Sequence, residues 1–171
     1  IFVYPGVTGI TNTLAWSPDG RLLAVAGGKN IVIWDTDISM ATRKLRRTMA
    51  NFSALSWASN GKYLAAATGN KVFLWMPDEE KRSKVRIYHY AMHINVIAWS
   101  PNGVYLAIGG SDRVIYIWNA HSERLVGSYR YHAQAVSAIA WAPDSQHVVS
   151  GSFTEHINIW DALNGFNIAS Y

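Results

Sequence analysis

Residues 15–35 read AWSPDGRLLAVAGGKNIVIWD, and the chain repeats this pattern three more times. The later copies are SWASNGKYLAAATGNKVFLWM (56–76), AWSPNGVYLAIGGSDRVIYIWN (98–119) and AWAPDSQHVVSGSFTEHINIWD (140–161). An internal repeat constrains the architecture before any other feature, because each copy must build the same unit.

All eight Trp residues fall into two registers of this repeat. The first register consists of Trp16, Trp57, Trp99 and Trp141, spaced 41, 42 and 42 residues apart. The second consists of Trp34, Trp75, Trp118 and Trp160, spaced 41, 43 and 42 residues apart. Since every indole has a fixed place in the repeat, we expect structural roles for them rather than stacking platforms for a ligand.

Each copy is predicted to form four short β-strands. In the first copy an apolar strand (TLAW) precedes a small-residue strand (RLLAVAG), and a β-branched strand (IVIW) follows. The fourth strands, at 42–49, 83–90, 123–130 and 166–171, are more polar, as an exposed sheet edge requires. Four short strands cannot bury their faces alone, but radial stacking of the copies can. The sequence therefore predicts an all-β propeller with four blades in this chain, each a four-stranded antiparallel sheet.

The turn after the first strand of each copy has its own signature, which reads SPDG, ASNG, SPNG and APDS. Pro presets φ for the second position, and Gly supplies the positive φ that leaves the turn. Ser145 stands where the other copies have Gly20, Gly61 and Gly103. We expect this fourth turn to be strained or differently shaped.

The composition excludes several classes of protein. Half of the 171 residues are hydrophobic and 15% are charged, which is typical of a chain that forms a core. No Cys is present, so disulfides, thiolate nucleophiles and Cys-ligated metals are excluded, and a reducing compartment fits. We find no apolar run long enough to span a membrane and no signal segment, and we expect a cytoplasmic, intracellular protein.

The WSPDG turn, the small-residue second strand and the closing IWD together resemble the WD-repeat family of β-propellers. The resemblance implies a hydrogen-bonded set that joins the third-strand Trp to a His, a Ser or Thr, and an Asp. Parts of this set match Asp112 in the third copy, and His132 and Ser150 in the fourth, where Thr154 takes the Asp position. The first two copies lack the His and the Asp, so we expect them to depend more on apolar packing.

Residues 1–9 belong to none of the four copies. Tyr4 lies 12 residues before Trp16, as Tyr129 lies 12 before Trp141, so 1–9 is predicted to be the fourth strand of a preceding blade. Within one propeller segment, 1–171, the blades are predicted at 10–50, 51–92, 93–134 and 135–171. We expect the chain to be part of a larger ring, completed by further blades of the same polypeptide or by a second copy as a homodimer.

Searches for catalytic, metal-binding and cofactor-binding patterns give no candidate residues. His89 and His93 have the spacing of a helical metal pair, but they flank a loop between strands, where that spacing separates side chains. There is no GxSxG motif and no phosphate-binding loop. We therefore expect no enzyme activity, no metal and no cofactor.

The loops that propellers commonly use for binding offer a mixed surface. We assign the partner-binding role to Met49, Asn51, His93, Arg113, Gln134 and Phe153. Met49 and Phe153 would serve as apolar anchors for a protein or peptide. Ordinary loop variation would produce a similar surface, and this alternative remains open.

Basic residues cluster around two of the fourth strands and are predicted to form a basic outer rim. They are Arg43, Lys44, Arg46, Arg47, Lys81, Arg82, Lys84 and Arg86. Charged outer strands block edge-to-edge pairing, which is one explanation. An acidic partner, anionic lipid or RNA backbone is the other.

Three functions fit these features. The first is a non-catalytic scaffold that binds protein partners. The second is a regulatory or sensor propeller of a larger signalling enzyme, such as a kinase. The third is binding of nucleic acid or anionic lipid through the basic rim.

Overall fold

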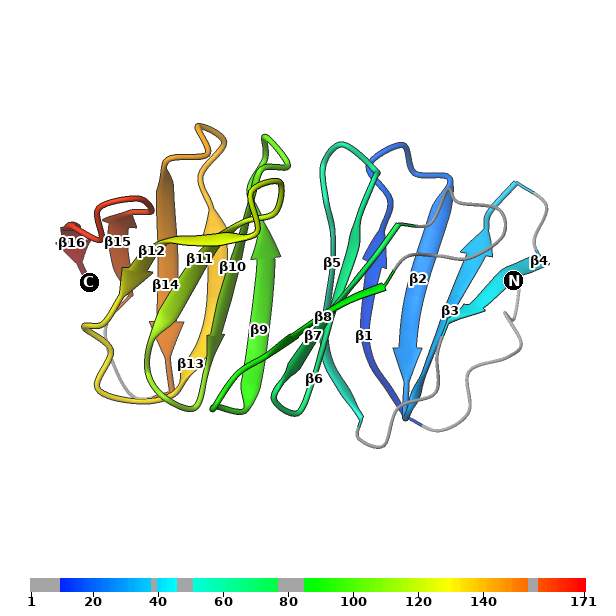
Figure 1. The fold of residues 1–171 in the computed structure, drawn as a ribbon, viewed down its shortest axis with the longest axis horizontal. Helices are drawn as coiled ribbons and strands as arrows, with labels where there is room; N and C mark the ends of the chain where they lie inside the picture. Colours follow the sequence, from blue (N-terminus) through cyan, green and yellow to red (C-terminus); the bar gives the residue numbers. More distant parts are fainter. Residues whose placement is uncertain (1–9, 38–39, 46–50, 77–84, 154–156) are drawn as a thin grey trace. The chain divides into compact units, whose positions relative to one another are not determined.

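The computed structural model describes residues 10–37, 40–45, 51–76, 85–153 and 157–171. These residues form four antiparallel sheets, each with four strands in chain order (Figure 1). No helix occurs in these ranges, which confirms the all-β fold and its four-stranded blades. The chain divides into two compact units, Ile1–His89 and Tyr90–Tyr171, and each unit holds two of the sheets.

The first unit contains strands β1 to β8. Its first sheet consists of β1 (Thr11–Trp16), β2 (Leu22–Gly27), β3 (Asn30–Asp35) and β4 (Met40–Leu45). Its second sheet consists of β5 (Phe52–Trp57), β6 (Leu64–Thr68), β7 (Lys71–Trp75) and β8 (Val85–His89).

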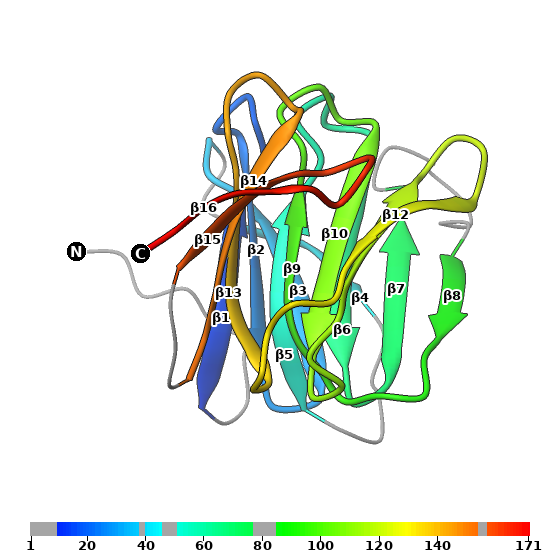
Figure 2. The same ribbon diagram turned by 90° about the vertical axis from the view of Figure 1, so that its left-hand side faces the viewer.

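The second unit contains strands β9 to β16. Its first sheet consists of β9 (Ile94–Trp99), β10 (Tyr105–Gly110), β11 (Ile115–Asn119) and β12 (Arg124–Tyr129). Its second sheet consists of β13 (Val136–Trp141), β14 (His147–Ser152), β15 (Asn158–Asp161) and β16 (Asn167–Ser170). This last sheet twists, so that β16 runs at an angle to β13 (Figure 2).

The register of the strands explains why Trp occurs twice in each repeat. In the first sheet Trp16 lies opposite Leu23, and Leu23 lies opposite Trp34. The same row recurs in the last sheet as Trp141, Val148 and Trp160. Residues opposite one another share a face of the sheet, so the two Trp registers meet on one face of each blade with an aliphatic residue between them.

The core of the first unit lies between its two sheets. Small and β-branched residues of β2 and β3, such as Ala26 and Ile33, are buried against Phe52, Leu55 and Trp57 of β5. Ala in the second strand allows this close approach, which is why that strand is rich in small residues.

The core of the second unit repeats this arrangement with an even tighter approach. A Cβ atom placed on Gly109 would lie 2.8 Å from Val136 Cγ1 and 2.9 Å from Ile139 Cδ1. Only Gly fits this position without a shift of the neighbouring strand. At the far side of the same core the Tyr129 ring stacks on Trp160, with centroids 4.7 Å apart.

All four turns after the first strands adopt one conformation. Gly20, Gly61 and Gly103 have φ of 73°, 71° and 69°, and Ser145 has φ of 59°. Each turn closes with a backbone hydrogen bond, for example Gly20 N to Ser17 O at 2.9 Å and Ser145 N to Ala142 O at 3.1 Å. The fourth turn is thus strained but not differently shaped, because its Ser occupies the left-handed region that favours Gly.

Candidate functional site

The antiparallel strand order places two kinds of loop at the same end of each sheet. These are the turn between the second and third strands and the connection that enters the next sheet. In the second unit this end carries His93, Arg113, Gln134 and Phe153, all of them exposed. Together with Tyr131, these residues are called the loop surface below.

Hydrogen bonds between neighbouring loops fix the backbone of the loop surface. Ser111 N donates to His93 O at 2.9 Å, and His93 N donates to Ser111 Oγ at 3.1 Å. Arg113, which has a positive φ of 71°, donates from Nη1 to Ala133 O at 3.4 Å. The turn after β10 is therefore tied both to the loop before β9 and to the loop before β13.

Two aromatic side chains of the loop surface are highly exposed. Tyr131 and Phe153 are each 74% exposed. The Tyr131 ring also contacts Tyr129, with centroids 5.3 Å apart, so it is held from one side. The sequence analysis did not single out Tyr131, because the repeat already explains Tyr129 as the aromatic residue that ends the fourth strand. A second aromatic residue two positions later, outside the repeat pattern, was the signal that could have identified it.

In the first unit, the loops at the corresponding end of the sheets carry more polar side chains. Asn51, Lys29 and Asn70 are exposed there. Met49, which was predicted as an apolar anchor, lies outside the described residues. The role of Met49 and Asn51 in partner binding stays a prediction.

A buried polar set in the second unit joins three residues that the family resemblance had placed together. His132 Nε2 lies 2.7 Å from Ser150 Oγ, and Trp160 Nε1 donates to the same oxygen at 3.0 Å. The three residues are almost completely buried. A hydroxyl both donates and accepts, so Ser150 bridges the loop before β13 to strands β14 and β15.

Asp112, the matching residue of the third copy, makes contacts around its own turn. Its carboxylate accepts from Tyr116 Oη at 2.8 Å and from Val114 N at 3.2 Å. Burial, followed by the contact with this carboxylate, raises the pKa of the Tyr116 hydroxyl. Asp112 therefore stabilises the entry into β11.

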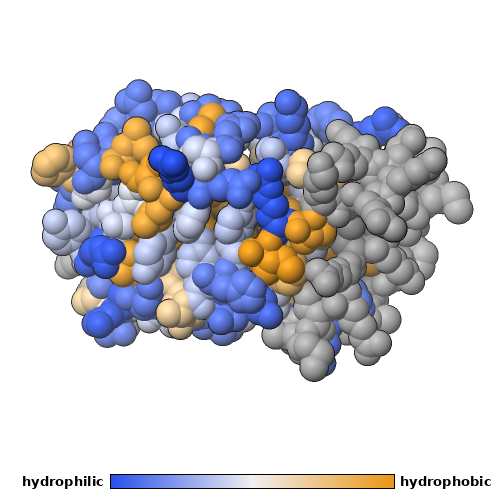
Figure 3. Space-filling model, in the orientation of Figure 1, coloured by the Kyte–Doolittle hydropathy of each residue, from blue (hydrophilic) through white to orange (hydrophobic). Residues whose placement is uncertain are grey.

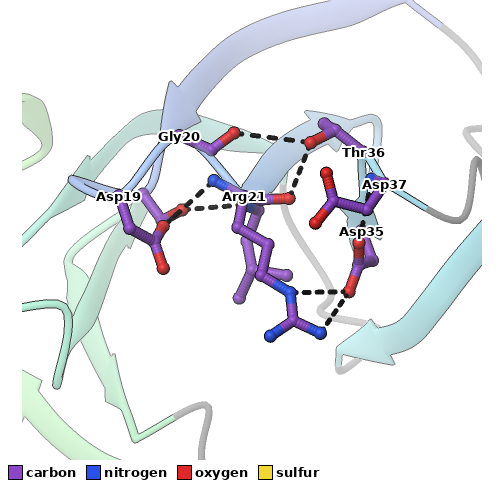
Figure 4. A network of polar contacts seen from close by, with 8 residues as sticks. Asp19, Gly20, Arg21, Asp35, Thr36 and Asp37 are labelled. Carbon is purple, nitrogen blue, oxygen red and sulfur yellow. Dashed lines mark hydrogen bonds and ion pairs between the residues drawn. The ribbon is translucent and has the colours of Figure 1, made fainter.

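At the opposite end of the first sheet, an ion pair joins two turns (Figure 4). Asp35 Oδ2 lies 3.1 Å from Arg21 Nη2 and accepts from Arg21 Nε at 3.1 Å. Arg21 N also donates to Asp19 Oδ1 at 3.0 Å. The Ser17 hydroxyl, followed by the Arg21 amide, lowers the pKa of Asp19. This network is structural, because it connects the ends of β1, β2 and β3.

In three of the four repeats, the residue after the second Trp caps the turn that follows the third strand; Met76 stands at this position in the second repeat. Asp161 Oδ1 accepts from the amides of Leu163 and Asn164 at 2.9 and 3.1 Å. Asn119 Oδ1 accepts from two amides of its own turn at 3.0 Å each. One side-chain oxygen is sufficient for this contact, so Asn replaces Asp without loss of the cap.

The structure describes three residues of the predicted basic rim. Arg43 and Lys44 lie on β4 and Arg86 lies on β8, and both are outer strands of their sheets. Arg46, Arg47, Lys81, Arg82 and Lys84 lie outside the described residues. A shared surface for RNA or anionic lipid stays a prediction.

Two further searches of the described ranges bear on the type of site. They contain no group of three His, Asp or Glu side chains placed to hold a metal ion. Over the same ranges, no helix is long and apolar enough to cross a membrane.

Comparisons with known families agree with this architecture. The model of the WD domain, G-beta repeat, matches residues 84–119 and 123–161, which contain strands β8 to β15. The matched repeats belong to the WD-repeat family, and all four blades of the chain are built on one pattern. The model of the eukaryotic translation initiation factor eIF2A matches residues 7–91. No curated protein matches the chain.

The two matches overlap at residues 84–91, and the blades on either side of the overlap differ in their polar contacts. The blades matched by the WD model contain the His132, Ser150 and Trp160 set and the Asp112 turn. The blades matched by the eIF2A model lack the corresponding His and turn Asp in their sequence. WD repeats generally mediate protein interactions, and domains built from them are typically non-catalytic.

Proposed function

We propose that this chain is a non-catalytic scaffold that binds protein partners through the loop surface. The observation that carries the proposal is the pair of exposed aromatic rings, Tyr131 and Phe153, on loops at the end of adjacent β-sheets. Figure 3 shows that apolar side chains interrupt the otherwise hydrophilic surface of this unit. Leu125 and Val126 of β12 are also exposed, and they serve as controls below.

The geometry of the loop surface favours binding without a large ordering cost. The hydrogen bonds of His93, Ser111 and Arg113 fix the backbone before a partner arrives. A pre-organised surface loses less conformational entropy on association. Tyr and Arg are also enriched among residues that dominate binding energy, and Tyr131 and Arg113 supply both types.

The partners that we propose are components of the translation initiation machinery, with the chain acting in the cytoplasm. The match of residues 7–91 to the eIF2A model supports this assignment. A second copy of the chain is a further protein partner, and it would use surfaces other than the loop surface.

A loop variant tests the proposed binding role. Arg113→Ala, Tyr131→Ala and Phe153→Ala are combined in one chain, and the control combines Leu125→Ala, Val126→Ala and Leu163→Ala, all exposed elsewhere on the same unit. Each chain is cross-linked to its partners in a translation extract, and captured proteins are quantified by mass spectrometry. We expect the loop variant alone to lose its partners at least tenfold, and equal capture by all chains would contradict the proposal.

The translation assignment has its own readout. In a sucrose gradient of the same extract, the wild-type chain is expected to migrate with initiation complexes, and the loop variant is expected to remain near the top. A wild-type chain that also remains near the top would remove the translation assignment. Urea unfolding of each variant shows whether its fold is intact.

A further inference from the structure

The loop before β9 places an imidazole and an amide in contact at the loop surface. His93 Nδ1 lies 3.3 Å from Asn95 Oδ1, and Asn95 Nδ2 donates to Val136 O at 2.9 Å. Asn95 therefore stands between the His93 ring and the backbone at the start of β13. The direction of these two hydrogen bonds decides which nitrogen of the His93 ring carries the proton.

The carbonyl of Val136 fixes the orientation of the Asn95 amide. A carbonyl oxygen only accepts hydrogen bonds, so the Asn95 atom in contact with it must be the donating nitrogen. Val136 has no exposed surface, so water does not take the place of this donor. An amide turned over would set two acceptors against each other and leave a buried carbonyl unpaired, which is unfavourable. The amide oxygen of Asn95 therefore faces His93.

The first unit contains the same amide bond without an imidazole beside it. Asn12 Nδ2 donates to Phe52 O at 3.2 Å, at the start of β5. Ile10, two residues before Asn12, occupies the position that His93 has in the third copy. The amide thus takes its orientation from the next sheet of its own unit, and the imidazole adapts to the amide.

The protonation of the His93 ring follows from the orientation of Asn95. Because Asn95 Oδ1 only accepts, His93 Nδ1 must donate and must carry a hydrogen. In a neutral imidazole the other nitrogen then has the lone pair, so His93 Nε2 is a hydrogen-bond acceptor. Among the described residues none bonds to His93 Nε2, and His93 is exposed. The acceptor is therefore available to a partner.

We propose that His93 is a specificity-determining residue of the loop surface, whose Nε2 accepts a hydrogen bond from an uncharged N–H or O–H group of the protein partner. Asn95 is the positioning residue that holds the ring in this tautomer. A partner without a donor at this point would leave Nε2 unpaired on binding, and this cost discriminates between partners. The inference rests on the proposed binding role of the loop surface.

The charge of a neighbouring residue favours an uncharged donor over an ammonium group. Ser111 holds His93 by two hydrogen bonds, from Ser111 N to His93 O and from His93 N to Ser111 Oγ. Arg113 lies two residues after Ser111 and is exposed, so an ammonium group beside His93 would meet a like charge. Arg113 only donates, whereas His93 Nε2 accepts. One group of each kind suits the C=O and N–H groups of a peptide backbone.

NMR spectroscopy tests the position of the proton without any partner. Long-range proton–nitrogen correlation spectra, recorded at a pH where imidazole is neutral, distinguish the two tautomers because the nitrogen without hydrogen resonates far downfield. His93→Gln removes one set of signals and so assigns the His93 ring. We expect the wild-type ring to carry its proton on Nδ1. A proton on Nε2 in the wild type would overturn the proposal.

Two variants of Asn95 separate the effect of its oxygen from that of its nitrogen. Asn95→Asp keeps an acceptor for His93 Nδ1, so the tautomer is expected to stay the same. Asn95→Ala removes the acceptor, and the ring is expected to move to the Nε2–H form that free histidine favours. Asn12→Ala is the matched control, because it removes the same bond between sheets where no imidazole is present. An unchanged tautomer in Asn95→Ala would contradict the positioning role of Asn95.

Substitutions of His93 test the contact with a partner. Each chain is cross-linked in a translation extract, and the proteins that the wild type captures are quantified by mass spectrometry. His93→Gln keeps an acceptor at the end of its side chain and is expected to retain capture. His93→Leu has no acceptor and is expected to lose at least about fivefold. The control is His121→Leu, which removes an exposed imidazole from another turn of the same unit and is expected to capture like the wild type.

The two kinds of measurement distinguish failure of this inference from failure of the proposed function. Equal capture by His93→Gln and His93→Leu would overturn the role of Nε2 as an acceptor, while binding at the loop surface would stand. A wild-type chain that captures no protein would remove the proposed function and, with it, the role of His93 in binding. The spectra would still report the position of the proton.

Discussion

At the scale of single residues, Gly127 shows how closely neighbouring sheets of the second unit approach. A Cβ atom on Gly127 would lie 2.2 Å from the backbone oxygen of Ala162. A backbone oxygen cannot rotate away as a side chain can, so Gly127→Ala forces the turn after β15 to move. We expect a loss of about 1–3 kcal/mol in the free energy of unfolding, measured by urea titration.

Gly151→Ala is the matched control for this change. It makes the same substitution in the neighbouring sheet, where nothing lies within 4 Å of the new Cβ. Measured in dilute protein, its unfolding midpoint is expected to equal or exceed that of the wild type, because Ala restricts the unfolded chain. Equal losses in both variants would show that the close approach of Ala162 is not the cause.

Ser145 combines backbone strain with a compensating contact. Its φ is 59°, yet its Oγ accepts a hydrogen bond from Asn102 N, in the adjacent sheet, at 3.0 Å. Ser145→Ala keeps the strain and removes the acceptor, so we expect a loss of about 0.5–1.5 kcal/mol in urea unfolding. Ser145→Gly removes both and is expected to be more stable than Ser145→Ala. The reverse order would contradict this account.

Asp144 makes the stability of the last sheet dependent on acid. The amide of His147, then the amide of Gln146 and the His147 ring, lower the pKa of Asp144 from 3.8 to about 2. A lowered pKa in the folded state means that the contribution is present above 3.8 and is lost as the pH falls towards 2. We expect the unfolding midpoint of the wild type to fall more steeply in this window than that of Asp144→Asn. Parallel pH profiles would contradict the prediction.

At the scale of strands, the indoles of β5 and β13 act as links between sheets. Trp57→Phe and Trp141→Phe keep an aromatic ring but remove the donors to Ala15 O and Ala98 O. Each is expected to cost about 0.5–1.5 kcal/mol in urea unfolding, because a partly buried hydrogen bond between two sheets is lost. Trp16→Phe is the control, since the Trp16 side chain is half exposed. Comparable losses at all three positions would show that the hydrogen bond contributes little.

The strands themselves were predictable because one pattern is repeated four times. The two Trp registers, the small-residue strand and the Gly turns each place a strand boundary, and the observed strands follow them closely. The contacts between strands were harder to predict. Neither the Arg21 and Asp35 ion pair nor the bonds of Asn12 and Asn95 belongs to the repeated signature, because each joins residues that vary between copies.

At the scale of the whole molecule, fold and family follow from the sequence more readily than the binding site does. A fold depends on features that every copy shares, whereas a binding surface depends on loops that differ from copy to copy. The sequence predicted an exposed Phe153 but did not predict the exposed Tyr131, because exposure is decided by how a loop leaves its sheet. The predicted basic rim and partner residues therefore stay predictions until binding is measured.

At one position of the first strands the residues alternate as Asn12, Ser53, Asn95 and Ser137, and the two Asn side chains donate to the next sheet of their own unit. Gain or loss of a single blade would set two like residues beside each other. A change by two blades would preserve the alternation. Pairs of blades are therefore the natural module for lengthening or shortening such a chain, whether by gene duplication or by design.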